Sequence, residues 1–315
     1  MISRTGSRSS TRPEPTGSAL PEGRFTPAKL RQVLAAACAR LGLDPAGARL
    51  LRFTNNAVFA LNGAPVVVRI VGSIRLRHRV GTVVRVAEHF ARHGVPAVRL
   101  LAGVEQPLDV EGHPVTVWDL VPFTGPPPTP ADLAGLLRRV HALPPPDGLP
   151  AWNPLRSIEA RVADAEELSA ADRRFLLERC AEVQDRLDTL DFPLTRGFVH
   201  GDAHPGNVLP GPDGPVLCDF DSSCVGPPEW DLTPLAVGRE RFGDPPARYA
   251  EFAAAYGFDV TSWPGFSVLR AVRELKLTTS VLPILRSHPP VRAELRRRLA
   301  DLRSGRTATA WTRYR

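Results

Sequence analysis

The chain has 315 residues, which exceeds the length at which one hydrophobic core grows efficiently, so we expect two lobes or domains. Hydrophobic residues make up 43% and charged residues 23%, which excludes a largely disordered or fibrous chain. The net charge of +7 would suit a nucleic-acid partner, but 38 of the 40 basic residues are arginines scattered over the whole length, which is typical of coding bias.

Residues 1–24 are rich in Ser, Thr, Arg, Gly and Pro, so we expect a disordered tail. A Thr-Pro start and apolar residues at helical spacing predict a helix from Thr26 to Leu41. Five short β-type runs and one helical stretch follow, which together predict a small, mostly antiparallel sheet with one helix. The expected strands are Leu50–Phe53, Val58–Leu61, Val66–Val71, Ala97–Leu101 and Val115–Val121, and the expected helix is Val80–Arg92.

A proline- and glycine-rich stretch at 122–130 can continue neither strand nor helix, so it reads as a linker between two lobes. The expected organisation is therefore an N-lobe at 25–121 and a larger C-lobe at 131–315. The second lobe is mainly helical by periodicity. Its expected helices are 131–143, 158–168, 171–190, 247–256, 265–282 and 291–302.

The four cysteines, Cys38, Cys180, Cys218 and Cys224, lack the spacing of a zinc site and are too few for a disulfide scaffold, so we expect buried free thiols. The sequence has no apolar run near the roughly 18 residues of a membrane helix and no apolar signal core. A cytoplasmic protein without a membrane partner is the expectation.

The most informative segment is His200-Gly201-Asp202-Ala203-His204-Pro205-Gly206-Asn207, followed by Cys218-Asp219-Phe220-Asp221. Two apolar runs each deliver carboxylates into loops. Asp202, Asn207, Asp219 and Asp221 form an oxygen-rich set suited to a hard cation, because Mg²⁺ prefers one or two carboxylates plus phosphate oxygens.

This segment resembles the catalytic and metal-binding loops of the aminoglycoside phosphotransferase family, relatives of the protein kinases. The family pattern His-Gly-Asp-x-x-x-x-Asn is matched at each fixed position, and Asp219 and Asp231 match two further acidic positions downstream. The resemblance implies an α+β, protein-kinase-like bilobal fold, with a small antiparallel-sheet N-lobe and a larger mainly helical C-lobe. It covers residues from about 45 to 285.

The resemblance also implies roles at the site. Asp202 would be the catalytic base that accepts the proton of the attacking hydroxyl, and Asn207 and Asp219 would hold Mg²⁺ against the phosphates of ATP or GTP. Asp221 would add an outer-sphere contact or cap its own turn. His200 is expected to orient the loop, with His204 at its surface.

A kinase also needs a cation on the α- and β-phosphates, and the lysines, Lys29 and Lys276, both lie outside the third strand. Arg69 stands where the family puts its basic residue; the alternative is an arginine facing solvent on an edge strand. The usual glutamate partner on the following helix is missing, because its position falls near Val83 and the helix carboxylate is Glu88.

The N-lobe offers further candidates for nucleotide contacts. Asn55 and Asn56 lie where kinases cover the phosphates with a loop, and an ordinary hairpin turn is equally compatible with them. Adenine is expected at the strand that enters the linker, formed by Trp118, Asp119, Leu120 and Val121.

The leading hypothesis is a small-molecule O-kinase that transfers the γ-phosphate to a hydroxyl of an antibiotic or metabolite. The alternative is a nucleotide-binding regulator without catalysis, which the missing helix glutamate suggests.

From Leu235 to the C-terminus, 15 basic against 7 acidic residues give an excess of +8, which favours a neutral or anionic acceptor over a polycationic aminoglycoside. Asp231 is expected to anchor a loop or helix start.

Overall fold

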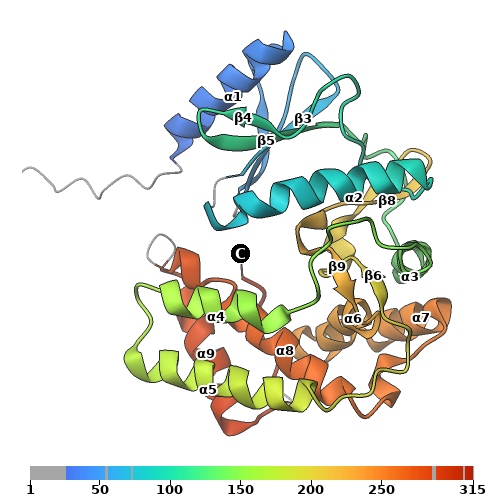
Figure 1. Ribbon diagram of the computed structural model, residues 1–315. Coiled ribbons are helices and arrows are strands. Elements are labelled where there is room, and N and C mark those ends of the chain that lie inside the picture. Colours follow the sequence, from blue (N-terminus) through green and yellow to red (C-terminus); the bar gives the residue numbers. More distant parts are fainter. Residues whose placement is uncertain (1–25, 54–55, 72–73, 286–288, 308, 315) are drawn as a thin grey trace, which may run out of the picture.

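A computed structural model describes residues 26–53, 56–71, 74–285, 289–307 and 309–314. It has two lobes: a small antiparallel sheet with helices against it, and a larger helical lobe (Figure 1). The expected tail at 1–24 lies outside the described residues. The bilobal α+β architecture predicted from the sequence is confirmed.

The N-lobe sheet has five antiparallel strands in the order β1-β2-β3-β5-β4. Helix α1 packs on one face of this sheet, and α2 lies between the sheet and the C-lobe (Figure 1). The strands are β1 (Arg49–Phe53), β2 (Asn56–Ala60), β3 (Val66–Val71), β4 (Leu108–Val110) and β5 (His113–Asp119), and the helices are α1 (Pro27–Leu41), the short 3-10 segment η1 (Ile74–Arg79) and α2 (Val80–Arg92).

The alternation of side chains along β3 decides which residues face the C-lobe. Val66, Val68 and Ile70 pack with α1 in one hydrophobic cluster. Because successive side chains point to opposite faces of a sheet, Arg69 lies on the other face. It is opposite Thr116 of β5, and β3 is a central strand, so the alternative of a solvent-facing arginine on an edge strand is wrong.

The C-lobe is built from helices and two small two-stranded sheets. Its helices are α3 (Pro130–His141), α4 (Pro154–Asp164), α5 (Ala170–Leu187), α6 (Glu229–Phe242), α7 (Pro246–Tyr256), α8 (Phe266–Thr279) and α9 (Val291–Ser304). One sheet pairs β6 (Gly197–Val199) with β9 (Cys224–Gly226), and the other is a hairpin of β7 (Val208–Gly211) and β8 (Gly214–Leu217). The four cysteines are free thiols, and all but Cys218 are buried.

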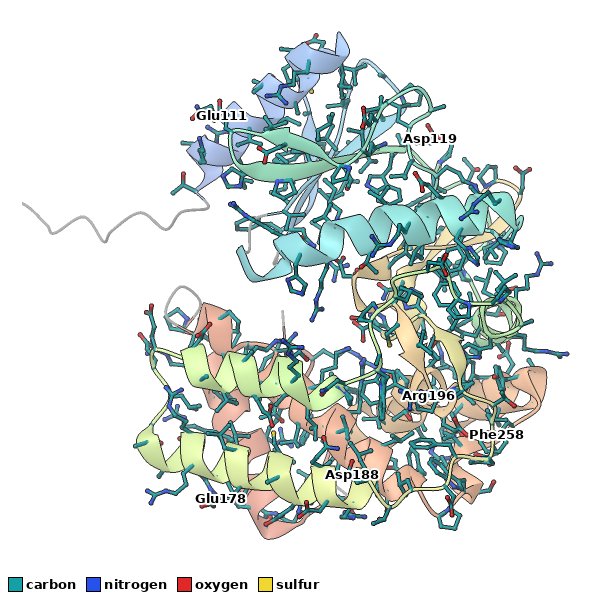
Figure 2. The ribbon with its side chains drawn as sticks, viewed as in Figure 1. Glu111, Asp119, Glu178, Asp188, Arg196 and Phe258 are labelled. Atoms are coloured by element: carbon teal, nitrogen blue, oxygen red, sulfur yellow. The ribbon has the colours of Figure 1, made fainter. Side chains whose placement is uncertain are left out.

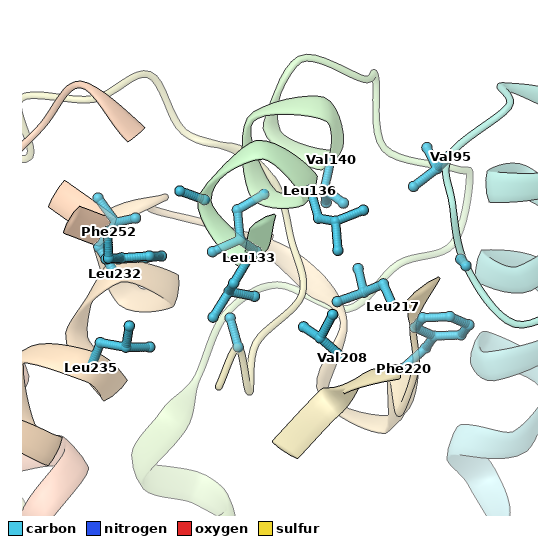
Figure 3. Packing of buried hydrophobic residues seen from close by; sticks show 14 of the residues in the cluster. Val95, Leu133, Leu136, Val140, Val208, Leu217, Phe220, Leu232, Leu235 and Phe252 are labelled. Atoms are coloured by element: carbon cyan, nitrogen blue, oxygen red, sulfur yellow. The ribbon is translucent and has the colours of Figure 1, made fainter. Parts of the chain in front are cut away.

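Two hydrophobic clusters stabilise the structure around the two-stranded sheets of the C-lobe. One joins α2 and β5 to the C-lobe through Leu133 of α3, Val208, Leu217 and Phe220, which lie close together in Figure 3. The other is formed by α4, α5, α8 and α9. The loops between β6 and β7 and between β8 and β9 therefore lie between two packed regions, and these loops carry the predicted site.

Three sequence predictions of secondary structure were wrong. Residues 97–101 form isolated bridges, Ala97 with Leu217 and Leu100 with Trp118, instead of a strand, because the segment passes between β8 and β5 and pairs briefly with each. The fifth strand of the sheet is β4. Helix α6 was missed because Pro234 stands inside it, and an interior proline removes a helix hydrogen bond.

Candidate active site

The loop between β6 and β7 carries the His-Gly-Asp segment and is held by a buried carboxylate. Asp231, at the start of α6, accepts hydrogen bonds from the backbone N–H groups of His200 (2.7 Å) and Gly201 (2.8 Å). The His141 Nε2 atom lies 3.1 Å from the same carboxylate. Three donors on one buried acid fix the backbone just before Asp202, which is the loop-anchoring role expected of Asp231.

His200 holds the same loop from inside. Its ring is fully buried, its Nε2–H donates to the carbonyl oxygen of Cys218 at 3.0 Å, and its Nδ1 accepts from the backbone N–H of Asp202 at 3.3 Å. Both ring nitrogens are used, so His200 orients the loop as expected. His204 is half-buried, not at the surface as expected, and burial lowers its pKa to about 4.

Asp202 is held asymmetrically. Its Oδ1 accepts a hydrogen bond from Arg273 Nη1 at 2.6 Å and another from Lys276 Nζ at 3.0 Å, both on α8. Its Oδ2 accepts no hydrogen bond from any residue that the structure describes. Burial raises the pKa of Asp202, but Lys276 and Arg273 outweigh this effect and hold the pKa well below its ordinary value. One oxygen is therefore fixed, and the other is left for a further donor.

Asn207 ends the same loop and brings it against the second acidic segment. Its Nδ2 donates to the carbonyl oxygen of Asp202 at 2.9 Å, and its backbone carbonyl accepts from Cys218 N–H at 2.9 Å. The side chain is fully buried, and its Oδ1 has no hydrogen-bond donor within the described chain. A buried carbonyl oxygen without a donor is costly in an apolar site and is an oxygen that a cation can use.

Asp219 and Asp221 flank a buried phenylalanine. Phe220 packs edge-on against Phe90 at a centroid distance of 5.1 Å, which fixes the segment between them. Asp219 has left-handed backbone angles (φ 69°, ψ 69°), which are uncommon for a residue other than glycine and are often found at functional sites.

The two carboxylates are close enough to oppose each other's ionisation. Burial and the like charge of Asp221 raise the pKa of Asp219 to about 6, although Arg52 Nη1 lies 3.2 Å from Asp219 Oδ2 and lowers it. A divalent cation bound beside two such carboxylates would offset their repulsion and stabilise their ionised forms. Asn207 Oδ1 and the Asp219 carboxylate therefore fit a Mg²⁺ ion, and the phosphate oxygens of a nucleotide would complete its ligands.

Arg69 reaches across to the C-lobe. Its Nη2 lies 2.7 Å from Oδ1 and 2.6 Å from Oδ2 of Asp221, and both side chains are largely buried. On α2, Val83 is buried and Glu88 is exposed. A carboxylate partner for Arg69, which the sequence lacked on the helix, is thus supplied by Asp221. The turn-capping and outer-sphere roles of Asp221 stay predictions.

The candidate adenine segment ends β5 and enters the linker. Trp118 is buried and its indole N–H donates to Thr116, whereas Asp119 is exposed (Figure 2). The N–H groups of Asp119 and Leu120 donate to carbonyls of the N-lobe, and the N–H of Val121 has no acceptor in the described ranges. Asn56 begins β2 opposite Val71, and Asn55 lies outside the described residues.

Comparison with known proteins decides the family. Residues 49–273 match the family model described as "Phosphotransferase enzyme family" (APH). The chain belongs to this family. The match covers most of the chain, from β1 to the first half of α8, and includes Asp202, Asn207 and Asp219. It confirms the resemblance noted in the sequence.

Solved structures of phosphotransferase relatives share the fold. A choline/ethanolamine kinase family protein from Mesorhizobium loti is 20% identical, with coverage of 88% of this chain and 93% of that chain and a TM-score of 0.62. Amicoumacin kinase hAmiN in complex with AMP-PNP, Ca²⁺ and Ami is 15% identical, with coverage of 90% and 97% and a TM-score of 0.69. Choline kinase LicA from Streptococcus pneumoniae is 16% identical, with coverage of 87% and 99% and a TM-score of 0.63. No curated protein sequence matches the chain.

The described residues contain neither a metal-binding cluster of His, Cys, Asp and Glu nor a membrane-spanning helix. Among the described residues, no group of three or more His, Cys, Asp or Glu side chains is placed to hold a metal ion. No helix in the same ranges is both long and apolar enough to cross a membrane.

Sequence reasoning missed the cations around Asp202. Arg273 and Lys276 lie more than seventy residues along the chain from the carboxylate that they contact. The basic excess after Leu235 was the one available signal, and it could not single out positions. Because residues three apart lie on the same face of a helix, the spacing of the two becomes informative only once α8 is known to face the loop.

Proposed function

We propose that this phosphotransferase family member transfers the γ-phosphoryl group of ATP, or of GTP, to a hydroxyl group of a small molecule. The observation that carries the proposal is the asymmetric environment of Asp202. Two cations hold Oδ1, while Oδ2 accepts no hydrogen bond from the described chain. A carboxylate so fixed and ionised can accept the hydroxyl proton at one defined oxygen.

The reaction balances with the residues present. The acceptor oxygen forms a bond to the γ-phosphorus, the bond from that phosphorus to the β,γ-bridging oxygen breaks, and the nucleoside diphosphate leaves with its electron pair. The hydroxyl proton passes to Asp202. Because phosphoryl transfer depends mainly on positioning and charge neutralisation, the rigid loop anchored by Asp231 and His200 supports catalysis.

The nucleotide would lie between the lobes. A bound Mg²⁺ would neutralise phosphate charge, held by Asn207 Oδ1 and Asp219. Arg69 would contribute a fixed cation on the phosphate side, and Val121 N–H, at the linker, would be a donor for the base. In this proposal residues 25–121 bind the nucleotide, 122–130 connect the lobes, and 131–315 carry the catalytic loop and acceptor site.

A nucleotide-binding regulator without catalysis is the second candidate. Its support was the missing glutamate on α2, and that support weakens because Asp221 pairs with Arg69 in its place. The two candidates differ in one measurable property, which is turnover.

The test is ADP release from Mg-ATP in the presence of a panel of hydroxyl compounds, run beside calorimetric titration with AMP-PNP and Mg²⁺. A phosphotransferase binds AMP-PNP and releases ADP in proportion to a phosphorylated product. AMP-PNP binding without acceptor-dependent ADP release across the panel would support the regulator. No binding of either nucleotide would refute both candidates.

A further inference from the structure

Four cationic side chains from three elements lie near the catalytic loop. Arg273 and Lys276 come from α8 and bind Asp202 directly. Arg161 comes from α4, which packs against α8, and Arg79 ends η1 in the N-lobe. Side chains with nitrogen atoms extend from the N-terminal end of α2 and from α4 toward the space between the lobes (Figure 2).

These cations are poorly compensated by carboxylates. Arg273 and Lys276 share the single Oδ1 of Asp202. Arg161 forms no hydrogen bond or ion pair with any described residue, and its Nη1 atom is buried. The contact recorded for Arg79 is a long hydrogen bond of 3.5 Å to the backbone oxygen of Asp221. Among the ion pairs of the described residues, Asp202 is therefore the carboxylate that these cations share, and it binds two of the four.

The cations also lower the pKa values of two among them, Arg161 and Lys276. Burial, and then Arg79, lower the pKa of the Arg161 guanidinium, and Asp202 raises it. Burial also lowers the pKa of Lys276, and both Arg273 and Arg161 add to this effect, against Asp202. A half-buried cation without a partner has a high free energy, which an anion bound among these groups would lower.

We propose that the acceptor is an anion, a hydroxyl compound that carries a carboxylate or phosphate group, and that Arg161 binds this group. The inference rests on the proposed function, because it names the substrate class of the same site. The oxyanion would lie between Arg161 and the α8 cations and place the hydroxyl at Asp202. A polycationic acceptor would meet like charges there.

The position of the cluster separates the acceptor from the nucleotide. The candidate phosphate cation Arg69 lies on β3 and pairs with Asp221, and the candidate metal ligand Asp219 follows β8 and pairs with Arg52. Arg161 lies on α4, which packs against α8, the helix whose cations bind Asp202. A guanidinium on α4 therefore suits the acceptor, since its planar fork matches carboxylate and phosphate oxygens.

The test uses the whole chain saturated with AMP-PNP and Mg²⁺, so that the nucleotide phosphates already occupy their site. Calorimetry then measures the binding of 3-phosphoglycerate, which has a hydroxyl, a carboxylate and a phosphate, and compares it with glycerol and choline. We expect 3-phosphoglycerate to bind and the neutral and cationic compounds not to bind. Arg161→Gln should weaken this binding about tenfold, the value of one charge-assisted hydrogen bond.

Arg156→Gln is the matched control, because it removes the same charge from an exposed position of the same helix. It should leave the affinity for 3-phosphoglycerate unchanged. The proposal is overturned if 3-phosphoglycerate does not bind, or if Arg161→Gln and Arg156→Gln have the same affinity for it. It is also overturned if Arg161→Gln weakens the binding of AMP-PNP and leaves the binding of 3-phosphoglycerate unchanged. Failure of AMP-PNP itself to bind would instead refute the proposed function, so the two failures are distinguishable.

Discussion

Arg69 of β3 and Asp221, which follows β8, form an ion pair between the lobes, with 2.7 and 2.6 Å from Arg69 Nη2 to the two carboxylate oxygens. The side chains are 11% and 15% exposed, so the pair is largely removed from water. This contact ties the central strand of the N-lobe to the segment that carries Asp219. Arg69 therefore has a carboxylate partner in the C-lobe, where the sequence offered none on α2.

Arg69→Ala should therefore have two effects. The apparent KM for ATP should rise and kcat should fall, because a fixed cation is lost from the phosphate side. The free energy of unfolding should fall by about 3 kcal/mol, because the buried Asp221 is left without its partner. Steady-state kinetics and urea unfolding measure the two effects separately. Arg69→Lys should restore only part of each, since a point charge replaces a planar fork.

The double variant Arg69→Met/Asp221→Leu is the control for stability. Replacing both charges by apolar groups should recover most of the lost free energy of unfolding, while ATP binding stays weak. If the double variant instead bound ATP normally, Arg69 would have no role at the nucleotide.

Asp219→Ala should weaken the binding of AMP-PNP in the presence of Mg²⁺ by about tenfold or more, because the metal ion loses one ligand carboxylate. Binding of AMP-PNP with EDTA present should change little, since the carboxylate acts through the cation. Titration calorimetry with and without Mg²⁺ gives both values. Equal loss under the two conditions would contradict the metal assignment.

Because of Asp219, the free energy of unfolding of the protein without nucleotide should depend on pH. The pKa of Asp219 is raised to about 6 in the folded chain, against an ordinary value of 3.8, so the ionised carboxylate opposes folding above pH 6. Asp219→Asn should then raise the free energy of unfolding by about 1 kcal/mol at pH 8. The gain should shrink as the pH falls from 6 to 4, where the wild-type group takes up its proton. Thermal unfolding across this range would show it, and a pH-independent difference would contradict it.

Asp231→Asn should lower kcat without changing the metal dependence of nucleotide binding. The amide has only one acceptor oxygen, so it cannot serve the N–H groups of His200 and Gly201 and the ring of His141 together. The free energy of unfolding should fall by about 2 kcal/mol. Asp244→Asn, at an exposed pair with Arg313, is a control expected to change neither property.

The sequence predicted the elements whose signal is local. Thr26 caps α1 as its Thr-Pro start indicated, and β3 and α2 have the predicted bounds. Helix α6 was not predictable in this way, because it is buried on many sides and contains Pro234. The motif placed Asp202 and Asn207 on one loop, but the partners of Asp202 and Arg69 depend on tertiary packing. No local pattern could reveal them.

The most direct measurement is the effect of Asp202→Asn on single-turnover phosphoryl transfer to an acceptor identified by the panel. We expect the rate constant to fall by about 10²- to 10⁴-fold, while the Kd for AMP-PNP with Mg²⁺ stays within a few-fold of the wild-type value. Asparagine cannot take the hydroxyl proton but keeps the size of the side chain. A rate constant close to the wild-type value would show that Asp202 is not the catalytic base.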